Sequence, residues 1–403
     1  MNTFNVQQFI KKAIVNRDEM LCSLDIEQHQ EELKNKIYQK AFLVIGGAGT
    51  IGAAYIKSIL PFEPGSITVI DYNENGLTEL IRDLRSTPHL KVPPSFITYP
   101  FDFGSPLLAK LLDAHSFDVI ASFAAHKHVR SEKDILAVEA MIQNNVFNTW
   151  NLLNLAKEHQ INSVFAVSTD KASNPVNVMG GSKKIMENIL LAFSDQLKIT
   201  TARFANVAFS NGSLLDGFIH RMALGQPLTA PSDVKRYFVT PSESGAICML
   251  ASLLGESSDI FFPKLEEGSM KTFSEIADQF LFELGLTPAT CTSENEAKEK
   301  AAKRSADDKT YPVYYFESDT TGEKSFEEFY TQEEKLDLDT FKSLGIIKDS
   351  NIPSLKIIHD QLEILKDLFS RKGTTKEVVI LLMKDIIPEF THQEKGKNLD
   401  SKM

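Results

Sequence analysis

A glycine-rich loop between an apolar run and a helical pattern constrains the fold of this chain more than any other feature. The loop reads Gly46-Gly47-Ala48-Gly49-Thr50-Ile51-Gly52 and follows the short apolar run AFLVI at 41–45. Glycines let the backbone turn tightly, and a helix that starts at once presents unpaired N–H groups and a positive dipole end. A strand, a glycine loop and a helix in this order predict a pyrophosphate-binding turn.

Apolar runs alternate with helical patterns along the first half of the chain. The runs lie at 66–71, 117–123, 163–168 and 200–204, and helical stretches such as 138–158 separate them. Strands that alternate with helices predict a parallel sheet that is covered on both faces. We therefore expect an α/β fold of the Rossmann type, a doubly wound parallel sheet with a smaller C-terminal substrate-binding lobe.

The end of the second run indicates which dinucleotide binds. Asp71 follows Gly52 by nineteen residues. A carboxylate at this position accepts hydrogen bonds from the adenosine ribose and repels a 2′-phosphate, which favours NAD over NADP. The residues expected to bind the cofactor are Gly46, Gly49, Thr50, Ile51, Gly52, Asp71, Asp102, Ala124 and Ala125. Asp102 has an equally plausible alternative role as a helix cap.

The remaining segments suggest how the chain is divided. We expect a helical arm at 1–40, an NAD-binding domain at 41–205, a substrate-binding lobe at 206–345 with a polar insertion at about 290–310, C-terminal helices at 346–390 and a disordered tail at 391–403. The arm is expected to pack on the domain or on a neighbouring subunit, because its apolar residues recur at helical spacing.

Composition excludes several classes of protein. The formal net charge of -11 argues against nucleic-acid binding, which requires a basic surface. The three cysteines, Cys22, Cys248 and Cys291, have no metal-binding spacing, so no metal is expected. The N-terminus lacks the pattern of a secretory signal and no apolar run has the length of a membrane span. We therefore expect a cytoplasmic protein without a membrane partner.

A second cluster of reactive side chains follows the run at 163–168. Thr169, Asp170 and Lys171 emerge together at the carboxyl end of a predicted strand. A hydroxyl, an acid and an amine side by side suit proton transfer. A helix-capping loop with a surface ion pair would explain the same residues, so both interpretations stay open at this point.

Ordered motifs make the chain resemble a known family. They are GGAGTIG (46–52), DYNENGL (71–77), AAHKHV (124–129), NNVFNT (144–149), STDKASNPVNVMGGSK (168–183), RFANV (203–207), KRYFVT (235–240) and TGEKSFEEF (321–329). From about residue 38 to about 330, the chain resembles the extended short-chain dehydrogenase/reductases, and within them the UDP-N-acetylglucosamine 4,6-dehydratases. Longer members carry membrane helices ahead of this domain, and the chain is expected to resemble the soluble forms.

The resemblance implies a changed catalytic pair. The superfamily normally uses Tyr-x-x-x-Lys, and here Met179 stands at the tyrosine position with Lys183 four residues later. The two share a helix face, so Lys183 is still expected to reach the nicotinamide ribose. Met179 cannot exchange a proton. Another base is needed for the sugar hydroxyl, and Asp170, relayed through Thr169, is the candidate.

The resemblance also implies a reaction. NAD would accept hydride from carbon 4 of a UDP-sugar, water would leave across carbons 5 and 6, and the hydride would return to carbon 6. Lys171 would remove the proton on carbon 5, which requires a partly neutral amine, and burial or nearby cations are expected to lower its pKa. Asp170 would protonate the leaving hydroxyl. The inverse assignment of Asp170 and Lys171 is an open alternative.

Further residues are assigned to the substrate. Those expected near the nucleotide sugar are Lys127, His128, Asn206, Ser213 and Arg236. The guanidinium of Arg236 matches phosphate oxygens and is the expected diphosphate clamp. Glu323 and Lys324 belong to a family motif whose role the sequence does not reveal. The superfamily usually dimerises, so a homodimer or a larger homo-oligomer is expected.

Two other functions fit the same motifs. One is a nucleotide-sugar 4-epimerase or ketoreductase of the same fold, although an epimerase would be expected to keep the tyrosine. The other is a non-catalytic NAD-binding sensor, which the loss of that tyrosine favours and the intact Asp170, Lys171 and Lys183 oppose.

Overall fold

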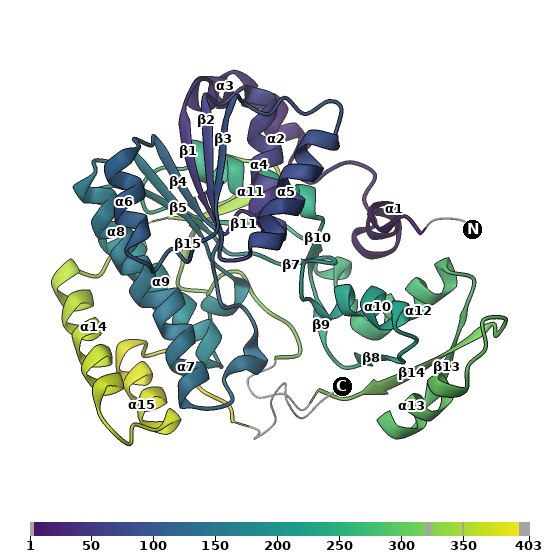
Figure 1. The fold of residues 1–403 in the computed structure, drawn as a ribbon. Coiled ribbons are helices and arrows are strands. Elements are labelled where there is room, and N and C mark those ends of the chain that lie inside the picture. The colour runs from purple at the N-terminus through teal and green to yellow at the C-terminus, as the bar shows by residue number, and fades with distance from the viewer. Residues whose placement is uncertain (1–3, 319–323, 349, 395–403) are drawn as a thin grey trace.

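The computed structural model describes residues 4–318, 324–348 and 350–394. Within these residues a nine-stranded sheet forms the centre, in the order β15-β16-β11-β6-β5-β4-β1-β2-β3 (Figure 1). The bounds of its strands are β1 Ala41–Ile45, β2 Ser66–Ile70, β3 Ser95–Tyr99, β4 Val119–Ser122, β5 Ser163–Val167, β6 Lys198–Ala202, β11 Ile260–Pro263, β15 Lys335–Asp337 and β16 Leu344–Lys348.

Most of this sheet is parallel. The strands from β3 to β11 pair in parallel, whereas β16 is antiparallel to both β11 and β15. From β1 the chain continues to β2 and β3 on one side and to β4, β5 and β6 on the other. Open α/β sheets bind ligands at such a switch point, at the carboxyl ends of the strands. The expected doubly wound Rossmann-type fold is confirmed.

Both faces of the sheet are buried, because successive side chains enter different apolar cores. In β1, Phe42 and Val44 join one core, whereas Leu43 and Ile45 join the other. The first core includes side chains of α3 (Gln30–Ile37), α4 (Thr50–Ile59), α5 (Glu74–Ser86) and α11 (Pro241–Leu254). The second includes side chains of α6 (Leu107–Ala114), α7 (Ile135–Ile142), α8 (Asn148–Glu158), α9 (Val178–Ala192), α14 (Leu355–Ser370) and α15 (Lys376–Ile386).

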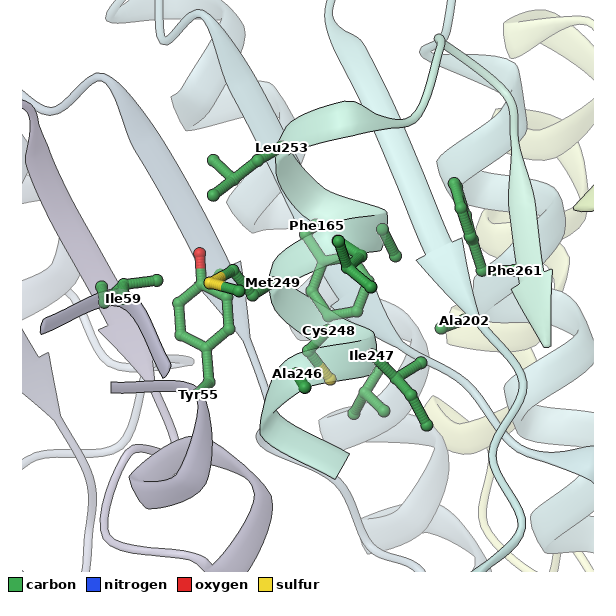
Figure 2. Packing of buried hydrophobic residues seen from close by; sticks show 14 of the residues in the cluster. Tyr55, Ile59, Phe165, Ala202, Ala246, Ile247, Cys248, Met249, Leu253 and Phe261 are labelled. Carbon is green, nitrogen blue, oxygen red and sulfur yellow. The ribbon is translucent and has the colours of Figure 1, made fainter. Parts of the chain in front are cut away.

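Helices α4 and α11 pack closely on the first face. A Cβ at Gly245 would lie only 2.3 Å from the carbonyl carbon and oxygen of Ala54, so a glycine at this point of α11 permits the contact. Figure 2 shows Tyr55 of α4 beside Met249 of α11, with Phe165 of β5 near the same helix. This packing holds α4, and with it the glycine loop, firmly against the sheet.

A smaller lobe contains its own sheet. Its strands are parallel, in the order β13-β14-β8, and their bounds are β8 Leu228–Pro231, β13 Thr287–Cys291 and β14 Thr310–Phe316. The lobe's helices are α10 (Leu214–Ala223), α12 (Phe273–Glu283) and α13 (Glu294–Lys303). Helix α13 lies in the predicted polar insertion, and the ion pairs Glu294–Lys298 and Glu296–Lys300 form along it at 3.7 and 2.7 Å.

The N-terminal arm packs on both parts of the chain. Its elements are α1 (Val6–Phe9), η1 (Ile10–Val15), α2 (Ser23–Gln28) and α3. Phe9 and Ile14 lie in the core of the lobe, whereas Leu33 and Ile37 lie in the first core of the main sheet. Arg17 forms a 2.8 Å ion pair with Glu243 of α11. The arm therefore connects the lobe to the sheet.

The chain does not divide simply at residue 205. Strands β11, β15 and β16 come from beyond that position and extend the main sheet. Two short ladders lead from the sheet toward the lobe, β7 (Asn206–Val207) with β10 (Phe238–Val239) and β9 (Lys235–Arg236) with β12 (Lys271–Thr272). The limits of the domains remain a prediction. The segment 206–345 contributes strands both to the main sheet and to the smaller lobe.

The beginning of the expected disordered tail is ordered. The backbone N–H groups of Thr391 and Gln393 donate to the carbonyls of Pro175 and Val176, both at 3.1 Å. His392 Nε2 lies 3.2 Å from Glu132 Oε1, and both side chains are buried. Disorder from residue 391 is therefore wrong for 391–394, and the other tail residues lie outside the described ones.

The remaining short helices are η2 Leu60–Phe62, η3 Val129–Ser131, η4 Gln143–Phe147, η5 Asp170–Ala172 and η6 Glu267–Ser269. In the part of the chain that the structure describes, no helix is both long and apolar enough to cross a membrane. Across the same residues, no group of His, Cys, Asp or Glu side chains is arranged to hold a metal ion.

Candidate active site

The glycine loop between β1 and α4 is closely packed against the end of β4. Gly46 has a φ of +72°, and a Cβ there would lie 2.7 Å from the backbone nitrogen of Ala124. A Cβ at Gly52 would lie 2.5 Å from the carbonyl oxygen of Gly46. Side chains at these two positions would fill the turn. The first turn of α4 follows at Thr50, with no side chain capping its N–H groups.

Asp71 holds this loop from the end of β2. Its Oδ2 accepts a hydrogen bond from Ala48 N at 3.0 Å, and its Oδ1 accepts one from Asn73 N at 2.9 Å. The carboxylate is 9% exposed and lies beside the loop, as expected for an acid that faces the adenosine ribose. The cradle, the uncapped helix start and this acid fit a dinucleotide with two phosphates.

Asp102 has a different environment from Asp71. Its side chain is exposed, and Oδ1 accepts a hydrogen bond from Gly104 N at 2.6 Å, which stabilises a turn. The next helix, α6, has Pro106 at its N-cap and no side-chain cap. The helix-cap alternative for Asp102 is therefore wrong.

The reactive cluster after β5 is assembled as the sequence predicts. Thr169 Oγ1 donates to Asp170 Oδ1 at 2.8 Å, and Lys171 Nζ donates to the same oxygen at 2.9 Å. The Asp170 and Lys171 side chains are only 5% and 15% exposed. This burial contradicts the surface ion pair of the alternative interpretation. Its helix cap is present, because Thr169 Oγ1 accepts from Lys171 N at 3.4 Å at the start of η5. Strands β1, β4 and β5 are neighbours and run parallel. The glycine loop and this cluster follow the carboxyl ends of β1 and β5, so both lie at the same end of the sheet.

Glu327 also belongs to this cluster, and sequence reasoning missed it. Its Oε1 lies 3.9 Å from Lys171 Nζ and 3.9 Å from Arg236 Nη2, and its Oε2 lies 3.8 Å from Lys324 Nζ. The side chain is 3% exposed. Its only sequence signal is the acidic pair in SFEEF, next to the motif residues Glu323 and Lys324. Glu323 itself lies outside the described residues.

The segment that carries Glu327 is fixed to the turn after β5. Ser173 Oγ donates to the carbonyl of Glu328 at 2.7 Å, and Asn174 Nδ2 lies 3.3 Å from Glu328 Oε2. On its other side, Lys235 N donates to the carbonyl of Ser325 at 2.9 Å. These bonds tie the segment both to the turn after β5 and to β9.

The charges around Lys171 correct one sequence expectation. Burial lowers the pKa of Lys171 and Arg236 lowers it further, but the carboxylates of Asp170 and Glu327 outweigh both, so the net pKa is raised. We expected a lowered value. For Glu327, burial is the largest influence and raises the pKa of the carboxyl, despite the opposing charges of Lys171, Arg236 and Lys324.

Met179 and Lys183 both lie buried on α9. Lys183 Nζ donates to the carbonyl of Val167, the last residue of β5, at 2.7 Å. Burial lowers the pKa of Lys183 to about 8, with partial compensation by Glu187. A Cβ at Gly180 would lie 2.5 Å from the carbonyl oxygen of Lys171, so the start of α9 packs directly on the turn that carries Lys171.

Several residues assigned to the substrate surround one loop. Lys127 Nζ donates to the carbonyl of Asn211 at 2.9 Å, and Asn211 N donates to Thr50 Oγ1 at 2.9 Å. A Cβ at Gly212 would lie 3.6 Å from His128 Nε2. Ser213 caps α10 by accepting from the N–H of Asp216. Asn211, which the sequence did not single out, therefore connects the glycine loop to the loop after β4.

Two further residues assigned to the substrate lie elsewhere. Asn206 opens the short strand β7, and its N–H donates to the carbonyl of Tyr237 at 3.1 Å. Arg236 is buried, and its Nη1 donates to the carbonyls of Lys235 and Lys324 at 2.9 and 3.0 Å and lies 3.3 Å from that of Ser325.

A buried ion cluster lies next to the carboxyl end of β5. Arg203 is fully buried and forms 2.9 Å ion pairs with Glu187 of α9 and with Glu334. Ser168, just after β5, donates to Glu187 Oε1 at 2.6 Å. Burial alone would lower the pKa of Arg203, but these carboxylates outweigh it, so the net pKa is raised. The arginine of RFANV is therefore a structural residue.

Comparisons with known proteins agree with this architecture. The pattern of a family described as polysaccharide biosynthesis protein matches residues 42–348. An uncharacterized membrane protein of Methanocaldococcus jannaschii is 31% identical over 252 residues, which cover 61% of this chain and 73% of that protein. The capsular polysaccharide biosynthesis protein CapD of Staphylococcus aureus is 28% identical over 262 residues, or 64% of this chain. The aligned part spans 42% of the length of CapD.

Other similar proteins have different named activities. A UDP-glucose 4-epimerase of Rickettsia typhi is 26% identical over 244 residues, which cover 59% of this chain and 69% of the epimerase. Pen from Bacillus thuringiensis superposes with a TM-score of 0.61 at 20% identity, covering 79% of this chain and 91% of Pen. The dTDP-glucose 4,6-dehydratase DesIV of Streptomyces venezuelae, solved with NAD bound, gives a TM-score of 0.54 at 20% identity, covering 72% and 88%. These two structures share the fold.

Proposed function

The chain belongs to the polysaccharide biosynthesis protein family, and we propose that it is an NAD-dependent nucleotide-sugar 4,6-dehydratase. The proposed substrate is UDP-N-acetylglucosamine or a close NDP-hexose, and the product is the 4-keto-6-deoxy sugar. The observation that carries the proposal is the cluster of Thr169, Asp170 and Lys171 at the same end of the sheet as the glycine loop. This arrangement can move two protons close to a bound cofactor.

The cofactor would be held by the loop at 46–52 and by Asp71. Its pyrophosphate would meet the N–H groups at the start of α4, and its adenosine ribose would meet the Asp71 carboxylate. Lys183, near the end of β5, is the proposed ligand of the nicotinamide ribose. When bound, NAD supplies hydride acceptance at carbon 4 and hydride return at carbon 6.

Asp170 is the proposed base for the hydroxyl on carbon 4, with Thr169 as the connecting hydroxyl. The 2.8 Å bond between them gives the proton a short path from substrate to carboxylate. Asp170 then holds this proton and delivers it to the hydroxyl that leaves carbon 6 as water. One residue thus accepts and returns one proton, which accounts for the absence of a tyrosine at Met179.

Lys171 is the proposed base for the proton on carbon 5. Its pKa is raised in the free enzyme, chiefly because the carboxylate of Asp170 opposes the effect of burial. Protonation of Asp170 in the first step removes that negative charge. Burial then favours the neutral amine, which can accept the proton from carbon 5 and later return it.

A 4-epimerase is the second candidate, because similar proteins include UDP-glucose 4-epimerases. Product mass separates the two functions. Incubation with UDP-N-acetylglucosamine yields a ketone lighter by one water if the dehydratase proposal holds, and an isomer of unchanged mass if the protein is an epimerase. The proposal also includes the expected cytoplasmic setting and a homodimer or larger homo-oligomer, whose size light scattering measures.

A further inference from the structure

We propose that Glu327 is a positioning residue that acts through Lys171, by accepting the ammonium proton and so leaving a neutral amine for carbon 5. This inference rests on the proposed function and extends it by one residue outside the Thr169–Asp170–Lys171 cluster. The observations that carry it are the burial of Glu327, the 3.9 Å between its Oε1 and Lys171 Nζ, and the lack of a hydrogen-bond donor for its Oε2 among the described residues.

The carboxylate of Glu327 is only partly satisfied. Among the described residues, no donor lies within hydrogen-bond distance of its Oε2, although the side chain is 3% exposed. Its charged neighbours, Lys171, Arg236 and Lys324, all lie at 3.8–3.9 Å, beyond a hydrogen bond. A buried carboxylate with an unsatisfied oxygen costs free energy, and protonation of the carboxyl reduces that cost.

The electrostatics of the pair change during the reaction. In the free enzyme Lys171 faces two carboxylates, Asp170 at 2.9 Å and Glu327 at 3.9 Å. When Asp170 takes the substrate proton, Glu327 becomes the single carboxylate that faces Lys171 among these groups. Burial disfavours both charges of the Lys171–Glu327 pair, so transfer of one proton from ammonium to carboxylate neutralises the pair.

The protons balance over one cycle. Once Asp170 is protonated and no longer holds the Lys171 ammonium, the lysine side chain closes the 3.9 Å gap to Glu327 Oε1 and gives it a proton. The resulting amine removes the proton from carbon 5. After water has left and carbon 6 has been reduced, Lys171 returns a proton to carbon 5. Glu327 then returns its proton to Lys171. Substrate becomes product plus one water, and the pair ends as it began.

This relay predicts a distinctive pH profile. Because the proton moves within the pair, the wild-type turnover rate should stay level across neutral pH. In Glu327→Gln the ammonium must lose its proton to solvent, so turnover should rise about tenfold per pH unit up to the pKa of Lys171. At neutral pH the variant should be slower by about 10²-fold. Arg236, Lys324 and Asp170 also face the pair and remain unchanged in this variant.

The experiment combines that profile with a measurement that needs no substrate. Competitive acylation followed by mass spectrometry gives the pKa of Lys171 in the unliganded wild type, in Glu327→Gln and in Glu328→Gln. Glu328 is adjacent but exposed, so it serves as the matched control. Removal of the Glu327 carboxylate should lower the pKa of Lys171, whereas the control should leave it unchanged. Glu327→Asp, which keeps a carboxylate, should retain the level profile at a reduced rate.

The outcomes separate this inference from the proposed function. A wild type that fails to dehydrate any nucleotide sugar contradicts the proposed function. In that case the acylation data still test whether Glu327 raises the pKa of Lys171, because they need no substrate. An unchanged pKa of Lys171 in Glu327→Gln would show that the Glu327 carboxylate does not act on Lys171, and it would overturn this inference. A Glu327→Gln profile that runs parallel to the wild type, merely lower, shows a structural role and also overturns the relay.

Discussion

The ammonium of Lys171 donates a 2.9 Å hydrogen bond to Oδ1 of Asp170, the same oxygen that accepts the hydroxyl of Thr169. One carboxylate oxygen therefore joins the proposed base for carbon 5 to the proposed path for the hydroxyl proton. Any change in the protonation of Asp170 must alter the pKa of Lys171. This coupling orders the two proton transfers.

Replacement of Lys171 by Ala should lower product formation by about 10²–10⁴-fold, because general-base catalysis at carbon 5 is lost. Cofactor binding, measured by fluorescence, should persist, since Lys171 does not belong to the glycine cradle. Lys91→Ala is the control, as that side chain is 81% exposed and pairs with Glu63 on the surface. Full activity in Lys171→Ala would remove this residue from the mechanism.

Asp71→Asn should shift the cofactor preference toward NADP. An amide oxygen can still accept one backbone hydrogen bond from the loop, but the charge that repels a 2′-phosphate is gone. The ratio of the NADP and NAD dissociation constants should change by about tenfold, equivalent to about 1.4 kcal/mol. Asp113→Asn, at a side chain that is 72% exposed, should leave this ratio unaltered. An effect of equal size in both variants would contradict the role of Asp71.

Lys183→Met should stabilise the unliganded protein at neutral pH while abolishing turnover. Burial lowers the pKa of Lys183 from its usual value of 10.5 to about 8. The folded state therefore binds fewer protons than the unfolded state between these values, and wild-type stability rises as the pH increases through this range. The upper limit of the gain at pH 7 is about 3 kcal/mol.

Thermal melts of the wild type and Lys183→Met between pH 7 and pH 10.5 check the sign. The advantage of the variant should shrink as the pH rises. An advantage that stays constant over this range would mean that the charge of Lys183 is not the cause.

His392→Ala should destabilise the fold by about 1–3 kcal/mol, because it leaves the buried carboxylate of Glu132 without one of its partners. Glu132 also accepts the N–H of Val178 at the start of α9, so loss of the histidine should loosen that helix start. Denaturant unfolding measures the change. Gln393→Ala keeps the backbone bond to Val176 and should be nearly neutral.

Sequence patterns were sufficient to place site residues whose position depends only on neighbouring residues. The apolar run before Gly46, Asp71 at the end of β2 and the stretch from Thr169 to Lys183 could be placed because strand ends and helix starts are set by neighbouring residues. Glu327 could not be placed, because its role depends on Ser173 and Lys235 holding a segment that is distant in sequence.

The electrostatic expectation for Lys171 was wrong for the same reason. Burial does lower its pKa, but the sum depends on two carboxylates, and one of them is contributed by the distant Glu327. Likewise, the charged residues after Phe390 suggested disorder, whereas His392 finds a buried partner in Glu132. Composition cannot reveal that one buried residue, distant in the sequence, forms an ion pair with a given side chain.

The most direct test of the central claim is to incubate the purified wild-type protein with UDP-N-acetylglucosamine and NAD in D₂O, and to analyse the nucleotide sugar by mass spectrometry and NMR. The account predicts a 4-keto product that has lost one water and carries deuterium at carbon 5, because the Lys171 amine carries deuterons in D₂O and returns one of them in place of the proton that it removed. An isomer of unchanged composition without label at carbon 5 would contradict the account and favour the epimerase.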